Sequence, residues 1–452
     1  MTNCGPERSL STSAATESGE RWAPVWVLAF VALWPAPGLA ASVLALGALL
    51  TLARLLHSRF RGGGAGLLSG PAWALTTLLF LAYWLPQPLS ALGAVDVPLA
   101  LRESAVDLRF LPFLWLVAMA AATPRGRRFT FNGLGVIAAI WTLDALVQAL
   151  CGTSPLFWSM DQLKWTISHH GLCTAQQAMA ADRLSGVFGP CNLKFGQVLV
   201  SVSPFLLWGA SRRGGAWGWL LAATAVGVVL VLAGSRASWI TYALLLVLSG
   251  WRLLGVRKLL ALGVAAVLGA GVLGLVSPQV HDRFERSARA LSGQPADLNA
   301  ALTGRAQIWA ASWCMIRQHP LSGVGVRAFR EAYAACNPTP AQPGEWGREP
   351  ALHAHQIVLE VLSETGVIGL LLWLAGAAQA WRAWRYASAA ARERARPAMQ
   401  ALLITVFPFN THLAFYSSFW GSLALLLVGL YVGALLAKEP DAGDRMDVVA
   451  SA

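Results

Sequence analysis

The sequence is poor in charged residues and in cysteine. Of its 452 residues, only 12% are Asp, Glu, Lys or Arg, which is about half the usual share for a soluble domain. That shortage excludes a soluble globular enzyme and a disordered chain. The six cysteines match no zinc-binding spacing, and they are too few for a disulfide scaffold. Runs of alternating polar and apolar residues, as in a transmembrane β-barrel, are also missing from the sequence.

Hydrophobic residues, by contrast, make up 56% of the chain. At ~20 apolar residues per membrane-spanning helix, this supplies roughly twelve spans. The 43 Gly and 21 Trp fit such a bundle, because Gly allows close helix packing and Trp favours membrane interfaces. We therefore predict an all-α polytopic membrane protein with about twelve transmembrane helices.

The apolar segments suggest how the chain is organised. The first two are separated only by residues 35–38 and could instead form one broken helix. The twelve segments cover residues 22–36, 39–56, 68–86, 108–123, 131–151, 195–210, 216–233, 236–250, 256–276, 355–379, 398–415 and 416–437. We expect a cytoplasmic tail (1–21), transmembrane helices 1–9 (22–276), a large periplasmic loop containing helices (277–354), transmembrane helices 10–12 (355–437) and a second cytoplasmic tail (438–452).

The distribution of positive charge predicts the orientation. The net charge is +12, and short cytoplasmic loops retain Lys and Arg. Every second loop between the apolar segments is basic, which places both termini in the cytoplasm and segments 152–194 and 278–354 outside. Because these residues are dispersed between spans, we expect no binding of nucleic acid. The basic residues of the inner loops are Arg54, Arg59, Arg61, Arg125, Arg127, Arg128, Arg212, Arg213, Arg252, Arg257, Lys258, Arg382, Arg385, Arg392, Arg394 and Arg396.

Within the second outer segment, residues 305–318 have helical periodicity. Trp309, Trp313 and Ile316 would form one stripe, with Thr303 as the N-cap and a proline after the end.

Four cysteines fall in the two outer segments. Cys173 with Cys191, and Cys314 with Cys336, are disulfide candidates if those segments are periplasmic. Four unpaired thiols remain the open alternative.

Three outer arginines are candidates for binding phosphate. Arg236 stands between two apolar spans on the face where positive charge is disfavoured, and a charged residue in such a place is a functional candidate. Arg305 opens the loop helix, and Arg183 precedes a Gly-rich stretch. The planar guanidinium suits phosphate oxygens, so these residues could clamp a diphosphate. The alternatives are contacts with lipid headgroups and surface ion pairs.

His355 stands where the outer loop meets the tenth span. At 100° per residue it would share a helix face with Leu359, Leu362, Gly366 and Gly369. An imidazole with a pKa near 6.5 suits a general base, although a lone His is more often structural. His353 lies two residues away, on a different helix face, and no carboxylate or Cys completes a ligand set. We therefore expect no metal and no cofactor.

Three sequence pieces together resemble the O-antigen ligase and polymerase superfamily of bacterial envelope glycosyltransferases. The first is His355-Gln356, nine residues, then Gly366-Val-Ile-Gly369-Leu370, which matches the His signature of the ligases. The second is the pair Ser235-Arg236 at the start of a span. The third runs from Gly304-Arg305 through Trp309 to His319-Pro320-Leu321-Ser-Gly323-Val-Gly325. The resemblance covers about residues 183–370.

This resemblance implies the transfer of a glycan from undecaprenyl diphosphate to a sugar of lipid A–core, on the periplasmic face of the inner membrane. By position, His355 would be the catalytic base, and Arg236 and Arg305 would be the essential arginines, with Arg183 beside them. Donor, acceptor and membrane lipids would be the partners. Three alternatives stay open: an O-antigen polymerase, an O-linked protein glycosyltransferase and, from another class, a lipid-linked glycan transporter. Two related halves, frequent in transporters, are not visible.

Overall fold

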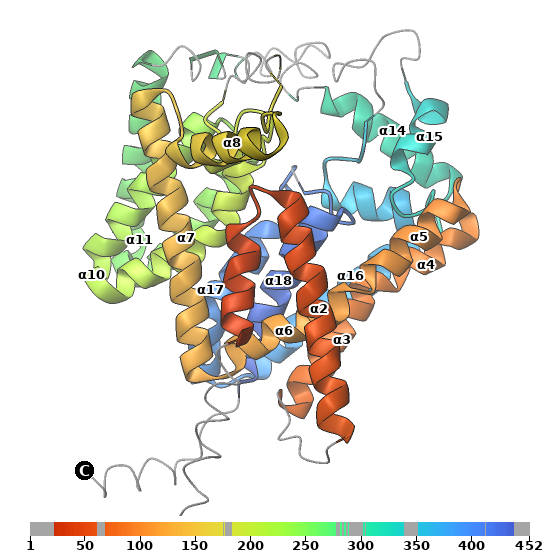
Figure 1. The fold of residues 1–452 in the computed structure, drawn as a ribbon. Coiled ribbons are helices and arrows are strands. Elements are labelled where there is room, and N and C mark those ends of the chain that lie inside the picture. The colour runs from red at the N-terminus through yellow and green to blue at the C-terminus, as the bar shows by residue number, and fades with distance from the viewer. Residues whose placement is uncertain are drawn as a thin grey trace, which may run out of the picture.

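All secondary structure in the described part of the chain is helical (Figure 1). Within the described residues, eight helices are long and apolar enough to cross a membrane. The protein is thus a multi-pass membrane protein by helix length and hydropathy, and the prediction of an all-α fold is confirmed. The computed structural model describes residues 22–60, 68–174, 176, 183–276, 281, 282, 284, 285, 288, 302, 304–338, 351–411 and 413–437. Both predicted tails and most of 277–303 lie outside this part.

The elements follow one another with short connections. After a short apolar helix at Trp22–Ala32, the order is α2 (Pro37–Phe60), α3 (Gly70–Trp84), α4 (Pro86–Ser90), η1 (Ala91–Gly93), α5 (Val97–Asp107), α6 (Phe110–Ala122), α7 (Pro124–Cys151), α8 (Pro155–Ser168), η2 (Gly186–Phe188), α10 (Phe195–Ala233), α11 (Arg236–Val276), α14 (Arg305–Gln318), α15 (Phe329–Cys336), α16 (Ile357–Tyr386), α17 (Ala389–Thr405) and α18 (Ser418–Leu435).

Two of these elements are helical hairpins. α10 has 39 residues and α11 has 41, each too long for one crossing at 1.5 Å per residue. Gly215 in α10 (φ 56°) and Gly255 in α11 (φ 75°) interrupt the helices. After each interruption, the second half of the element folds back along its first half. A Cβ on Gly218 would meet the Ala210 carbonyl, and one on Gly250 would meet Leu259.

With these two elements divided, each of the twelve predicted apolar segments contains a described helix, and α4, α5, α8, α14 and α15 are additional. Residues 22–36 and 39–56 give two separate helices rather than one broken helix. How many of the twelve cross the membrane stays a prediction. One boundary was wrong. The segment predicted at 398–415 is α17, which Ser388 caps at its N-terminus and which ends at Thr405. Pro408 follows, and the chain is irregular up to α18.

The core of the bundle is α18. It is apolar all round, as expected of a helix enclosed by others, and 83% of its residues are buried. It packs against α3, α6 and α17. The approach to α6 needs glycine, since a Cβ on Gly433 would lie 2.2 Å from the Ala118 carbonyl oxygen. This central packing fixes the helices that carry the polar residues at both ends.

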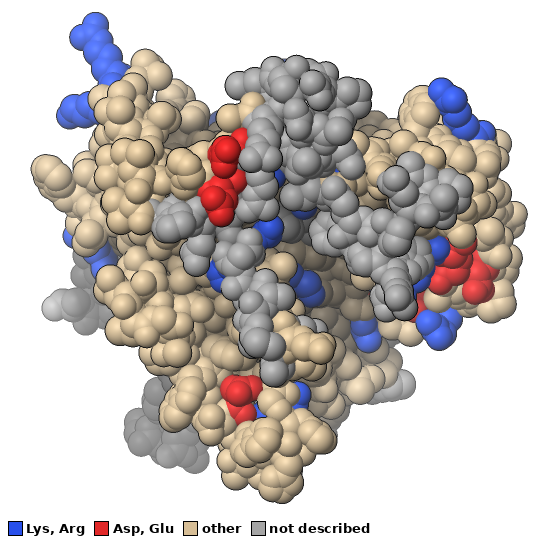
Figure 2. Space-filling model, turned by 90° about the horizontal axis from the view of Figure 1, so that it is seen from above, with Lys and Arg blue, Asp and Glu red and all other residues tan. Residues whose placement is uncertain are grey.

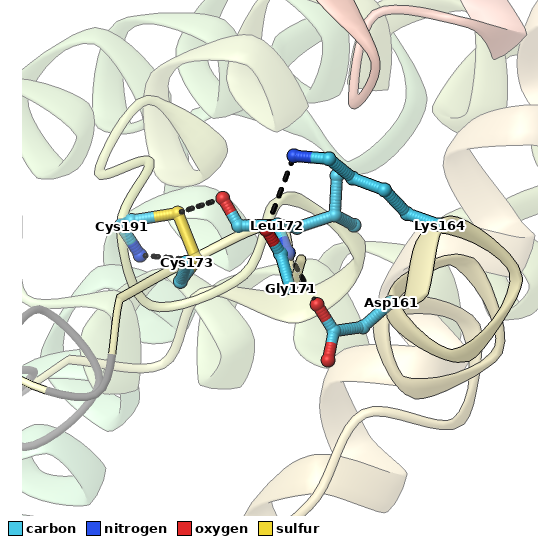
Figure 3. Close-up of a disulfide and its surroundings, with 6 residues drawn as sticks. All are labelled: Asp161, Lys164, Gly171, Leu172, Cys173 and Cys191. Carbon is cyan, nitrogen blue, oxygen red and sulfur yellow. Dashed lines mark hydrogen bonds between the residues drawn. A yellow bond between two sulfur atoms is a disulfide. The ribbon is translucent and has the colours of Figure 1, made fainter. Parts of the chain in front are cut away.

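One end of the bundle, the upper end in Figure 1, carries irregular chain held by disulfides. Both candidate pairs are bonded, Cys173 to Cys191 and Cys314 to Cys336. Figure 3 shows the first, which joins the turn after α8 to the chain entering α10. Lys164 on α8 donates to the Gly171 carbonyl at 3.1 Å, in the same turn. The bonded state decides the alternative that the sequence left open.

Candidate functional site

The turn between α10 and α11 carries two of the three arginine candidates. Arg236 is the first residue of α11. It follows Gly234, which ends α10 in the left-handed conformation (φ 65°). The backbone N–H of Leu184 donates to the Leu232 carbonyl at 3.4 Å. This hydrogen bond holds Arg183 beside the same turn, although more than 50 residues separate it from Arg236 in the sequence.

The third arginine, Arg305, begins α14. This helix covers Arg305–Gln318, so the prediction of a helix over 305–318 is confirmed. Its N-cap is Gly304 (φ 76°), and Thr303, the predicted cap, lies outside the described residues. Trp309, Trp313 and Ile316 share one stripe of this helix, as predicted, but that stripe is not its buried face. Trp313 is 50% exposed, and the buried face is formed by Ile308, Ala311, Ser312, Met315 and Ile316.

The three guanidinium groups are close enough to repel one another. The pKa of Arg305 falls to about 10, first because burial penalises its charge and then because Arg236 and Arg183 lie near it. Like charges held together in a partly buried place destabilise the protein, and an anion between them removes that cost. Figure 2, which looks onto this end of the bundle, shows basic side chains in the recessed centre of the face. The structure thus brings the three arginines into one anion-attracting cluster, here called the outer arginine cluster (Arg183, Arg236 and Arg305).

His355 does not lie on α16. The helix begins at Ile357 behind the N-cap Gln356, and Gly366 interrupts it (φ 67°). The predicted helix face shared by His355, Leu359, Leu362, Gly366 and Gly369 is therefore wrong. His355 itself has a φ of 53°, which is costly for a residue with a side chain. Its backbone N–H donates to His353 Nδ1 at 3.1 Å, a contact that stabilises the turn.

One hydrogen bond holds the His355 ring, and two others hold its neighbours in the chain. Its ring donates to the backbone carbonyl of Thr411, in the irregular chain between α17 and α18. Gln356 Nε2 donates to the Pro408 carbonyl at 3.3 Å, in the same segment. Trp309 Nε1 of α14 donates to the Ala354 carbonyl at 3.1 Å. Since Trp309 lies one turn after Arg305, this last bond couples the position of His355 to the outer arginine cluster.

The same surroundings set the protonation of His355. Its pKa falls to about 4, mainly because burial disfavours the charged ring and then because Arg305 lies near it, while the hydrogen bond to Thr411 opposes the shift. The imidazole is therefore neutral at pH 7. A neutral imidazole that donates through one nitrogen presents a lone pair on the other. This is the state that a general base requires.

A short segment after α14 docks onto the break in α16. The N–H groups of Val324 and Gly325 donate to the carbonyls of Ser363 and Glu364 at 2.8 and 3.0 Å. The N–H of Val367 in turn donates to the Pro320 carbonyl at 2.9 Å. Only glycine fits at the contact, since a Cβ on Gly366 would lie 2.2 Å from Leu321 O. The sequence pieces that contain Gly323-Val-Gly325 and Gly366-Val-Ile-Gly369 therefore meet here. Their contact joins the outer segment to α16.

Two buried carboxylates of α16 brace these segments. Glu364 Oε2 accepts the Arg327 N–H at 2.7 Å, and Glu360 Oε1 accepts the Tyr416 N–H at 3.2 Å. Glu360 Oε2 also lies 3.8 Å from His353 Nδ1. Both therefore support the loops around His355.

Sequence reasoning missed two features of this end. One is the Thr411 carbonyl, which residue type cannot reveal because every residue has a backbone carbonyl. The other is Lys194, at the entry to α10, whose pKa burial lowers and whose Nζ lies 4.5 Å from the centre of the Phe419 ring. Among the described residues, no group of three His, Cys, Asp or Glu side chains is placed to hold a metal ion. Of the other arginines in the outer segment, Arg283, Arg286, Arg289 and Arg348 lie outside the described residues.

The family resemblance is supported by comparison with known proteins. Residues 198–374 match the protein-family model described as O-antigen ligase. That range includes Arg236, Arg305 and His355, and it begins shortly after Arg183. Among curated proteins, none matches the chain significantly. Residues 198–374 are therefore similar to the O-antigen ligase family, the family that the three sequence pieces also resemble.

Proposed function

We propose that this protein is an O-antigen ligase. In this proposal it transfers a glycan from undecaprenyl diphosphate to a sugar of lipid A–core, on the periplasmic face of the bacterial inner membrane. The observation that carries the proposal is the outer arginine cluster, which is connected to a neutral His355 through the Trp309–Ala354 hydrogen bond. A cluster of cations suits a diphosphate, and a neutral imidazole beside it suits an acceptor hydroxyl.

Two independent features support the periplasmic orientation. Both disulfides lie in the outer segments, and disulfides persist in oxidising compartments such as the periplasm. The opposite ends of the helices carry the basic inner loops, as the positive-inside rule requires. The candidate site would then face the compartment in which the glycan acceptor is presented.

The apolar part of the donor also has a place beside the cluster. A cavity of about 510 Å³ lies between the two halves of α11 and the second half of α10. On the first half of α11 its wall is formed by Trp239, Tyr242, Ala243 and Leu246, which follow Arg236 down one side of the helix. With the diphosphate at the cluster, a polyprenyl chain would run from Arg236 into this apolar cavity.

The chemistry needs one bond to form and one to break. The acceptor hydroxyl oxygen attacks the anomeric carbon, and the bond from that carbon to the diphosphate oxygen breaks, with the electron pair leaving on the diphosphate. Arg236, Arg305 and Arg183 offset the negative charge that develops on the leaving group. His355 takes the hydroxyl proton. Attack from the side opposite the diphosphate inverts the anomeric centre.

Donor binding would also tune the base. In the free protein, burial lowers the pKa of His355 most, and the charge of Arg305 lowers it further. A bound diphosphate offsets that charge, so the pKa of the imidazole rises toward neutrality, where a general base is most effective. Proton transfer is thereby favoured only when the donor is present.

A reconstituted reaction tests the function. Purified protein is incubated with undecaprenyl-diphosphate-linked glycan and with lipopolysaccharide that lacks O-antigen, and the products are separated on a gel. We expect a ladder of glycan on lipid A–core. A longer lipid-linked glycan without transfer to lipid A–core would mean a polymerase, labelled protein would mean a protein glycosyltransferase, and glycan movement across vesicles without a covalent product would mean a transporter.

A further inference from the structure

A second cluster of arginine lies at the opposite end of the bundle. A cavity of about 620 Å³ opens there between the start of α7, the middle of α10 and the start of α17. In Figure 1, α7 starts at the lower end and runs to the upper end, so this cavity is far from the outer arginine cluster. Five arginines line it, together with one carboxylate, Glu393. The five arginines are Arg127, Arg128, Arg212, Arg213 and Arg394. The cavity that they line is here called the inner arginine pocket.

Five arginines and one acid make the lining of this pocket strongly basic. Glu393, its one acid, forms an ion pair with Arg396, so part of its charge is already used. The guanidinium of Arg212 lies 5.3 Å from the centre of the Trp208 ring, and Arg213 Nη1 donates to the Gly209 carbonyl at 3.3 Å. These contacts orient the two guanidinium groups at the cavity wall. Oriented guanidinium forks match phosphate oxygens in two-point contacts.

The pocket continues into an apolar cavity on the surface of the bundle. This second cavity, of about 560 Å³, shares Pro124, Arg128 and Asn132 with the first. Its other walls include Leu28, Phe129 and Val136, and the side chains of Phe129 and Val136 are more than half exposed. On a membrane helix, such exposed apolar residues face lipid chains. A phosphate-binding pocket that opens onto an apolar, membrane-facing wall has the two parts of a phospholipid site.

We propose that the inner arginine pocket binds the headgroup of an anionic phospholipid of the cytoplasmic leaflet, with an acyl chain along Phe129 and Val136. Basic pockets between transmembrane helices on this side bind cardiolipin-type headgroups. The inference rests on the orientation in the proposed function, but it concerns different residues and a different ligand. If these arginines served only to fix the orientation in the membrane, they would be scattered over the inner loops. Instead, three helices bring five of them to one cavity.

Lipid binding to the purified, delipidated protein tests the proposal. Native mass spectrometry compares phosphatidylcholine, phosphatidylglycerol and cardiolipin on the wild type, and inorganic phosphate and diphosphate serve as soluble competitors. We expect cardiolipin to bind most tightly and phosphatidylcholine least. For Arg128→Gln/Arg212→Gln we expect a loss of about 25-fold in cardiolipin affinity, since each basic residue near a membrane surface contributes about fivefold.

Two matched variants separate charge from geometry and from topology. Arg128→Lys/Arg212→Lys keeps the positive-inside charge but removes the guanidinium fork, and we expect an intermediate loss. Arg382→Gln/Arg385→Gln removes two exposed arginines from the end of α16, outside both cavities, and should bind cardiolipin as the wild type does. Equal affinity for all three lipids, or an unchanged affinity of the Gln pair, would overturn the proposal. Full displacement of cardiolipin by inorganic diphosphate would also overturn it, by indicating a soluble anion. Glycan transfer in lipid-free detergent tests the proposed function separately.

Discussion

Two arginine clusters lie at opposite ends of one helical bundle, and they differ in what surrounds them. The inner arginine pocket is formed by regular helices, and the positive-inside pattern predicts its charge. The outer arginine cluster is formed at turns in the left-handed region, at Gly234, Gly304 and His355, and it violates that pattern. It also lies near an imidazole. Arginine alone provides an anion site, while a strained backbone and a neutral imidazole beside it mark the end at which we propose that the chemistry takes place.

The largest effect that separates the two ends is expected from His355→Ala. Loss of a general base lowers turnover by about 10²–10⁴-fold, and the inner end has no equivalent residue among those lining its cavity. Glycan transfer by the purified variant, with a thermal melt as the folding control, is the measurement. A folded variant that retained more than about a tenth of the wild-type rate would remove the base from the mechanism.

Gly366→Ala should break the outer end by a structural route. A Cβ there would meet the Leu321 carbonyl at 2.2 Å, and the φ of 67° is unfavourable for alanine. We expect about 1–3 kcal/mol less stability and a parallel fall in transfer, because the segment after α14 would detach from α16. The matched control is Gly263→Ala on α11, where a Cβ meets no atom within 4 Å. Melting in detergent measures both, and equal melting temperatures would show that the close contact is not required.

A smaller effect is expected in the pH dependence. The pKa of His355 is lowered to about 4 in the free protein, so the ring is deprotonated above that pH and protonated below it. The acid limb of kcat/KM, which reports the free enzyme, should therefore fall only near pH 4. The limb of kcat should lie higher, because the donor offsets the charge of Arg305. Arg305→Gln removes that charge, so the acid limb of kcat/KM should move to higher pH. It would be measured on the activity that the variant retains. Identical limbs for wild type and variant would refute the coupling.

The smallest effect is expected from chelation. In the proposed mechanism, the arginines provide the positive charge that a divalent cation would otherwise supply to the diphosphate. Transfer in EDTA should therefore equal transfer without it. Loss of activity that Mg²⁺ or Mn²⁺ restored would show that the cluster does not suffice for leaving-group stabilisation.

How far the sequence predicted these two ends follows from what each is made of. Helix periodicity is local, so the helix at 305–318 and the twelve apolar segments were predictable, and the basic loops identified the arginines of the inner pocket. Arg183, Arg236, Arg305 and His355 were singled out by residue type and position, and their roles stay proposals. The left-handed turn at His355 and the break at Gly366 were not predictable, because backbone contacts from remote residues such as Thr411 and Leu321 stabilise them. Counting residues at 100° assumes an unbroken helix, which is why the predicted face was wrong.

The central claim is that the outer arginine cluster holds the diphosphate of the donor, and carrier affinity tests it most directly. Binding of undecaprenyl diphosphate is measured on the wild type, on Arg236→Ala/Arg305→Ala, and on Arg382→Ala/Arg385→Ala as the control with equal loss of charge at the other end. A charge-assisted hydrogen bond contributes roughly 1.5–3 kcal/mol, so the outer pair should lose at least about 100-fold in affinity and the control should lose none. Wild-type affinity in the outer pair would contradict the account.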